Sequence, residues 1–170
     1  MAEYNKIGSN YNLNRYADHR IINNLIELIN TSKESLIIDI GAGTGNYTNK
    51  LADYGFRVDA IEPSTLMIDQ AEKHSKVRWI ESSAENFDLQ KNSYDGAIST
   101  LAIHHFNSIE TSLSNIYETL KENSNLVIFG ADPRKIDDEC WFKEYFGFLI
   151  DKAIDSYTEV FELISKLEMQ

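Results

Sequence analysis

Three glycines at alternate positions, Gly41, Gly43 and Gly45, directly follow a short apolar run. Glycines gathered after a strand let backbone atoms come close to a ligand, because side chains there would block the approach. The dinucleotide fingerprint is G-x-G-x-x-G, and its third glycine would stand one residue after Gly45. The tighter spacing leaves room for an amino acid moiety rather than a pyrophosphate, so we expect a nucleotide-like ligand with such a group.

An acidic residue, Glu62, ends the next apolar run along the chain. A carboxylate at the tip of a second strand can accept hydrogen bonds from both hydroxyls of a ribose, and Glu62 lies near the expected distance after the glycines. The glycine turn and Glu62 together therefore predict a ligand site more strongly than either feature alone. The alternative is a structural turn and an unrelated surface glutamate.

Two adjacent histidines, His104 and His105, follow a later apolar run at residues 94–99. The loop after such a strand opens at the carboxyl end of a parallel sheet, where ligands bind. Histidine titrates near neutral pH, so His104 and His105 are the candidate catalytic residues. The alternative is that they shape the loop or contact a substrate without proton transfer. In either case we expect at least one of them to lie near the pocket for the substrate, beside the nucleotide-like ligand.

The elements that must position these residues alternate between strand and helix. Short apolar runs predict strands at residues 36–40, 57–61, 77–81, 94–99 and 125–130. Helical spacing and capping predict helices at about 18–30, 46–54, 64–74, 109–121 and 137–166, the last with a break near residues 155–156. Right-handed crossovers then predict a doubly wound, Rossmann-like α/β fold with a parallel sheet of strand order 3-2-1-4-5 and helices on both faces.

Length and composition favour one domain over residues 1–170, with an N-terminal cap and helix at 1–35, a cofactor-binding core at 36–133 and C-terminal helices at 134–170. The net charge of −11 and the lack of a basic patch disfavour nucleic acid as a partner. No apolar run is long enough to span a membrane, and the N-terminus lacks the layout of a signal peptide. We therefore expect a cytoplasmic protein that does not bind membranes.

Metal binding is not expected either. The single Cys140 excludes an internal disulfide and an all-cysteine metal site. The acidic run at residues 137–139 is more simply the start of a helix, where the helix dipole favours negative charge.

The order of these motifs resembles the class I S-adenosylmethionine-dependent methyltransferases, in particular the small-molecule type 11 group. Residues 36–45 resemble the first motif of that family, and residues 60–64 with Met67 resemble the second. Residues 83–87 resemble the segment beside the adenine, and residues 94–106 resemble the fourth strand with its loop. The resemblance spans about residues 11–133, and it implies methyl transfer from S-adenosylmethionine to a small-molecule acceptor, with S-adenosylhomocysteine as product.

The resemblance also implies roles for single residues. Asp39 and the backbone of the three glycines would hold the methionine part of the cofactor, and Glu62 would bind the ribose. The implied contacts around the adenine are made on one side by Ser64 and Met67 and on the other by Ser83, Ala84 and Glu85. The residues implied beneath the cofactor are Ser99 and Leu101. The residues implied to cover it and to reach its carboxylate are Tyr11, Arg15 and Tyr16.

Two departures from the family pattern stand out. Ser83 replaces an aspartate that would accept a hydrogen bond from the adenine amino group, so we expect weaker cofactor binding. The family fold also continues into an antiparallel hairpin, whereas no strand-like run follows Phe129 here. The fifth strand would then be an apolar edge, which proteins normally cover or pair. Either the chain is shortened, or its last helices or a second copy in a homodimer cover this edge.

Two other classes of function stay open at this point. One is a protein, truncated or dimeric, that binds S-adenosylmethionine or S-adenosylhomocysteine without catalysis. The other is a nicotinamide-dependent dehydrogenase, which the spacing of the glycines disfavours. The sequence identifies neither the acceptor nor the atom that is methylated.

Overall fold

The protein is described by a computed structural model over residues 17–135, 154–155 and 157–168. Five strands form one sheet in the order β3-β2-β1-β4-β5, and every pairing within it is parallel. The strands are β1 (Leu36–Ile40), β2 (Arg57–Glu62), β3 (Val77–Glu81), β4 (Tyr94–Thr100) and β5 (Leu120–Phe129). The predicted fold class and strand order are therefore confirmed.

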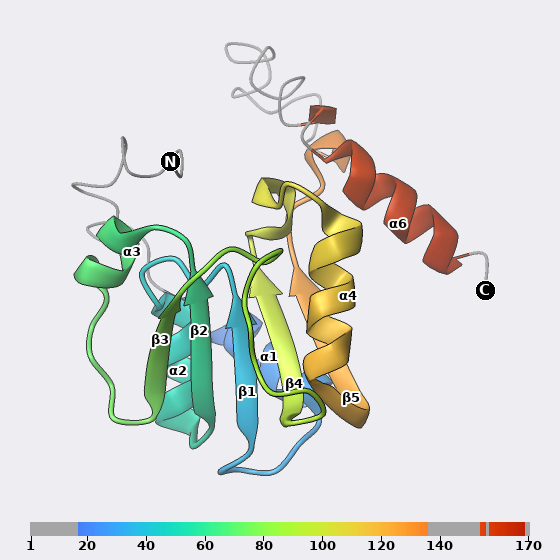
Figure 1. Ribbon diagram of the computed structural model, residues 1–170. Helices are drawn as coiled ribbons and strands as arrows, with labels where there is room; N and C mark the ends of the chain where they lie inside the picture. Colours follow the sequence, from blue (N-terminus) through green and yellow to red (C-terminus); the bar gives the residue numbers. More distant parts are fainter. Residues whose placement is uncertain (1–16, 136–153, 156, 169–170) are drawn as a thin grey trace.

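Helices cover both faces of the sheet (Figure 1). The helices of the described residues are α1 (His19–Ile29), α2 (Asn46–Tyr54), α3 (Thr65–Gln70), α4 (Ile109–Thr119) and α6 (Thr158–Glu168), with 3₁₀ turns at Ile103–His105 and Pro133–Lys135. α1 and α2 pack on one face and α4 on the other, whereas α6 lies beyond the carboxyl ends of the strands. The side chains of Asp18, Ser64 and Ser108 cap the starts of α1, α3 and α4, each accepting a bond from a backbone N–H. Polar caps before apolar runs thus set where these helices begin.

The core has one apolar layer on each side of the sheet. Leu25 of α1 and Leu51 of α2 pack with Ile37 and Val58 on one face. Ile116 of α4 packs with Ile38 on the other face. Successive residues of a strand point to opposite faces, so β1 needs apolar side chains on both, and its residues from Ile37 to Ile40 are all buried. Asp39 is the one ionisable residue in this strand, and it is also fully buried.

Two predicted boundaries differ from the structure by four residues or more, and the helix predicted to end at about Lys121 ends at Thr119. The helix that begins after Ser64 ends at Gln70 rather than near His74, because Ala71 is extended and the His74 ring accepts a hydrogen bond from the backbone N–H of Lys76 in the turn into β3. The fifth strand begins at Leu120 rather than at residue 125. Leu120 pairs with Tyr94, and the register then shifts before the next pairing. Residues 121–124, which lie in this irregularity, are polar. The sequence pattern therefore did not indicate that the strand begins before them.

β5 lies at one edge of the sheet within the part of the chain that the structure describes, and its Ile128 is 39% exposed. Whether a second copy covers this edge stays a prediction. Among the described residues, no helix combines the length and apolar character needed to cross a bilayer. Tyr11, Arg15 and Tyr16 lie outside the described residues, as do residues 137–153 of the predicted C-terminal helices, including Cys140 and the acidic run.

Candidate functional site

The glycine turn lies at the carboxyl end of β1, between that strand and α2. Gly41, Gly43 and Gly45 all have positive φ angles, of 76°, 59° and 79°. Residues with a Cβ rarely adopt this conformation, so it favours glycine at these positions. The backbone N–H groups of Gly41 and Ala42 both donate to the carbonyl oxygen of Ile61, at 2.9 and 3.0 Å, which joins the turn to β2.

The surroundings of these glycines differ in a way that locates the open side of the turn. A Cβ added to Gly41 would lie 2.5 Å from the Cβ of Ala102, and one added to Gly45 would lie 2.8 Å from the ring of Trp79. A Cβ added to Gly43 would meet nothing within 4 Å. Gly41 and Gly45 are therefore needed for close packing, whereas the backbone of Gly43 faces open space.

Glu62 connects the ends of β1 and β2. Its Oε2 accepts a hydrogen bond from the backbone N–H of Gly43, and its Oε1 accepts one from the N–H of Ser64, each at 2.9 Å. The residue is only 7% exposed, and burial raises the pKa of its carboxyl group although the two bonds oppose that effect. Each carboxylate oxygen has a second lone pair, so Glu62 can still accept bonds from two ligand hydroxyls.

Asp39 carries a buried charge with an incomplete set of partners. Its Oδ2 accepts a bond of 2.6 Å from the hydroxyl of Thr48 in α2, whereas its Oδ1 has no partner among the described residues. Burial raises the pKa of Asp39 to about 7, and repulsion from Glu62 adds to the rise while the Thr48 bond opposes it. A cationic group next to Oδ1 would stabilise the ionised form.

Other buried polar atoms near the carboxyl ends of β1 and β4 also lack a partner among the described residues: Thr44 Oγ1, Ser99 Oγ and His104 Nδ1. An unpaired polar atom that is kept from water costs about 1–3 kcal/mol. Such atoms at the ligand-binding edge of an α/β sheet fit a ligand rich in hydrogen-bonding groups.

The loop after β4 lies against the glycine turn, since Ala102 is next to Gly41. Leu101 has a positive φ of 55°, its N–H donates to the Phe129 carbonyl at 2.7 Å, and its side chain is 39% exposed. His104 is half-buried and stacks on the ring of Tyr157, with centroids 4.7 Å apart and an interplanar angle of 16°. Burial, and secondarily the neighbouring His105, lower the pKa of His104 to about 4. His105 itself is exposed.

Comparison with known proteins decides the family. A family model described as a methyltransferase domain matches residues 38–128, more than half of the chain. The chain belongs to the methyltransferase domain family. Together with the strand order, this match confirms the predicted membership of the class I S-adenosylmethionine-dependent methyltransferases.

Individual relatives agree with the assignment of this methyltransferase domain. A protein of Dictyostelium discoideum named as a putative methyltransferase is 38% identical over 61% of this chain and 39% of its own length. A probable S-adenosylmethionine-dependent methyltransferase of Saccharomyces cerevisiae is 27% identical over 86% of this chain and 54% of its own.

Among solved structures, a putative methyltransferase from an antibiotic biosynthesis pathway of Anabaena variabilis is 42% identical, with a TM-score of 0.78 over 83% of this chain and 56% of that one. The methyltransferase domain thus spans about half the length of these relatives.

The segment after β3 of the methyltransferase domain makes hydrogen bonds within the protein, and its predicted contacts with adenine stay predictions. The Glu85 carboxylate accepts bonds from the backbone N–H of Asn107 at 2.7 Å and from the hydroxyl of Ser112 at 3.2 Å. It therefore holds the start of α4. Ala84 is buried in the core, and Ser83 is partly exposed with its hydroxyl accepting a bond of 2.9 Å from the side chain of Asn86. Ser83 and Glu85 are both partly exposed.

The segment after β2 shapes the site mainly through its backbone. Ser64 is fully buried, and its hydroxyl accepts a bond from the N–H of Met67 at the start of α3. Met67 itself is only 2% exposed. The predicted adenine contacts of these two side chains stay predictions. Sequence reasoning missed Tyr157, because no motif marks a residue whose contact lies on a distant loop.

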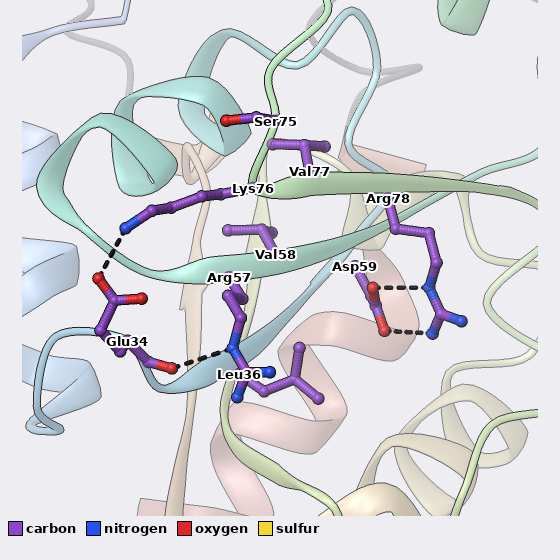
Figure 2. A pocket seen from close by; sticks show the side chains of 9 residues that line it. All are labelled: Glu34, Leu36, Arg57, Val58, Asp59, Ser75, Lys76, Val77 and Arg78. Carbon is purple, nitrogen blue, oxygen red and sulfur yellow. Dashed lines mark hydrogen bonds and ion pairs between the residues drawn. The ribbon is translucent and has the colours of Figure 1, made fainter.

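A hollow of about 390 Å³ lies at the amino ends of β1, β2 and β3, at the other end of these strands from the glycine turn (Figure 2). Its cations are already paired with neighbours. Lys76 Nζ lies 2.7 Å from Glu34, Arg78 binds the Asp59 carboxylate, and Arg57 Nε donates to the Glu34 carbonyl at 3.1 Å. These pairs bridge the strand starts, and the hollow is separate from the glycine turn.

Proposed function

We propose that this domain binds S-adenosylmethionine at the carboxyl ends of β1 and β2 and transfers its methyl group to a small-molecule acceptor. The observation that carries the proposal is the joint geometry of the glycine turn and Glu62, with the Gly43 N–H bonded to the Glu62 carboxylate. The family of the chain and the named activity of its yeast relative support it.

The residues present fit the cofactor. The unpaired Oδ1 of buried Asp39 would accept a bond from the ammonium of the methionine moiety, which would also neutralise the carboxylate. Glu62 would accept bonds from the two ribose hydroxyls. Gly43, with open space where a Cβ would project, would let the turn lie against the ligand. The exposed side chain of Leu101 would add apolar contact.

When bound, S-adenosylmethionine would supply an activated methyl group, which the acceptor nucleophile would take while sulfur keeps the electron pair of the broken carbon–sulfur bond. The protein then acts mainly by holding the two reactants close and in line. The acceptor would enter at the loop after β4, where Leu101 is exposed and the His104 ring stacks on Tyr157.

A small molecule is the favoured acceptor because the chain carries a net charge of −11. Such a charge repels the phosphates of nucleic acids. We also propose a cytoplasmic location. The single cysteine in the sequence supports it, since disulfides are rare in that compartment, and cell fractionation tests it.

Isothermal titration calorimetry with S-adenosylmethionine and S-adenosylhomocysteine tests the binding step. We expect both to bind with one site per chain, and Glu62→Gln to weaken binding about tenfold or more, because one acceptor of the carboxylate is replaced by an amide donor. Glu34→Gln is the matched control, since Glu34 is a paired acidic residue at the opposite edge of the sheet. No heat with either compound at about 1 mM would overturn the proposal.

Catalysis is tested separately, by following S-adenosylhomocysteine formation with a panel of small amines, thiols, carboxylic acids and phenols. Turnover with any member supports methyl transfer. Tight binding of both cofactor forms without turnover on a broad panel would instead favour a binding protein without catalysis.

A further inference from the structure

Tyr157 lies directly before α6 and bridges two loops of the site. Its ring stacks on His104 of the loop after β4. Its hydroxyl lies beside the segment just past the end of β5, 3.8 Å from the position that a Cβ on Gly130 would take. The residue is only 8% exposed, so this position is fixed by packing on all sides. Tyr157 therefore connects the carboxyl ends of the two neighbouring strands β4 and β5.

The packing around Tyr157 extends into an apolar cluster with Ile103, Ile109 and Val160. Phe161, one turn along α6, lies next to Tyr157 with ring centroids 5.8 Å apart. The guanidinium of Arg134 lies 3.5 Å from the centroid of the Phe161 ring, and Arg134 also pairs with Asp132 at 2.8 Å. These contacts attach α6 to the segment after β5 and hold Tyr157 against the loop.

His104 carries a buried ring nitrogen whose hydrogen-bonding capacity no described residue uses. Its Nδ1 is buried and has no partner among the described residues, while one face of its ring is covered by Tyr157. The charged or titratable groups around the stack are His105 on the same loop and the Asp132–Arg134 pair beyond β5. A ring fixed by stacking, with an unpaired nitrogen, is suited to bind a hydrogen-bonding partner in one direction.

We propose that Tyr157 is a positioning residue, which fixes the His104 ring so that Nδ1 hydrogen-bonds the acceptor beside the transferred methyl group. The proposal rests on the methyl-transfer function proposed above. Neither residue needs to move a proton in this arrangement.

The chemistry of His104 narrows the class of acceptor. Burial lowers the pKa of His104 to about 4, so the ring is neutral at neutral pH and too weak a base to deprotonate an aliphatic alcohol. The acceptor should therefore attack with a lone pair that is already free, as an amine, thiolate, carboxylate or phenolate has. Any proton left on a methylated amine would pass to water after the transfer.

Nuclear magnetic resonance titration of the histidine rings in the full chain tests the positioning without an acceptor. In the wild type we expect nuclear Overhauser contacts between the rings of His104 and Tyr157, and a His104 midpoint near pH 4. Tyr157→Leu removes the covering ring, so the midpoint should rise by about one pH unit or more towards the ordinary value of 6.5. Tyr157→Phe keeps the stack, so it should leave the midpoint near the wild-type value.

Tyr117→Leu is the matched control, because Tyr117 is a tyrosine on α4 that is 80% exposed, and it should change nothing. An unchanged midpoint in Tyr157→Leu, or missing ring contacts in the wild type, would overturn the positioning role. The ring contacts serve as the test if the leucine variant does not fold.

With an acceptor from the panel, Tyr157→Leu and His104→Asn should raise the KM for the acceptor about tenfold and leave the KM for S-adenosylmethionine unchanged. Equal effects on both constants would contradict the assignment to the acceptor side. Failure of the wild type to bind S-adenosylhomocysteine would refute the proposed function but not the contact between Tyr157 and His104. The ring contacts and the titration of His104 are measured without cofactor.

Discussion

Replacement of Asp39 by asparagine should have opposite effects on folding and on cofactor binding. The amide oxygen of asparagine can accept the bond from the Thr48 hydroxyl that Asp39 Oδ2 now accepts. The substitution therefore keeps the local packing and removes only the capacity to be charged. Because Asp39 is fully buried, its charge is costly in the folded protein until a cation lies beside it.

The size of the effect follows from the pKa of Asp39, which burial raises from an ordinary 3.8 to about 7. As the pH rises, the unfolded chain loses this proton first, so the free energy of unfolding falls between these two values and levels off above about pH 7. Each pH unit in this window is worth about 1.4 kcal/mol. From about pH 5 to pH 8 the wild type should therefore lose about 3 kcal/mol that Asp39→Asn does not lose.

Urea unfolding of both proteins at several pH values measures this difference directly. Wild type and Asp39→Asn have all other titrating groups in common. The difference between their free energies of unfolding, followed against pH, therefore reports the titration of Asp39. Calorimetry on the same samples should show that the variant binds S-adenosylhomocysteine about 10- to 100-fold more weakly, since a hydrogen bond between charged groups is worth about 1.5–3 kcal/mol.

Wild-type affinity should also fall as the pH is lowered below about 7, because Asp39 then becomes protonated in the free protein. Parallel stability curves for wild type and variant across this pH range would refute the reasoning, since they would show that Asp39 titrates normally in the folded protein. Unchanged affinity in the variant would show that the carboxylate does not contact the ligand.

Substitutions in the site loops give further tests. Gly43→Ala should cost only about 1–2 kcal/mol of stability, from its positive φ, but should weaken S-adenosylhomocysteine binding at least about tenfold because the new methyl group projects into open space beside the turn. Gly41→Ala should be clearly less stable than Gly43→Ala in thermal unfolding, because its Cβ would lie 2.5 Å from that of Ala102. The reverse order would contradict the assigned open side. Ser83→Asp should tighten binding about three- to tenfold in calorimetry by adding an acceptor for the adenine amino group, and equal or weaker binding would place the adenine elsewhere.

The sequence predicted those parts of the fold in which local signals and packing agree. The runs that became β1 and β3 are apolar and partly β-branched, and their predicted bounds match the structure. Asn46–Tyr54 was also predicted correctly, because glycines stand at both ends of it. The start of β5 was missed because residues 121–124 are polar and interrupt the pairing with β4.

The site was predictable to a similar degree. The glycine turn and Glu62 adjoin each other because parallel strands bring their carboxyl ends to one edge. The direction in which a side chain points is not encoded in a motif, so the bonds of Glu85 to α4 could not be foreseen. The stack of Tyr157 on His104 depends on how α6 docks, and neither spacing nor composition indicates that contact.

The two backbone bonds to Glu62 have a consequence for the kinetics of binding. The N–H groups of Gly43 and Ser64 fix both carboxylate oxygens before any ligand arrives. A glutamate on a flexible surface would lose rotamer freedom on capturing a ribose, whereas Glu62 has already lost that freedom during folding. Recognition of the ribose should thus be a rigid docking step with little conformational delay. Differences in affinity among nucleoside ligands should then appear mainly in their dissociation rates.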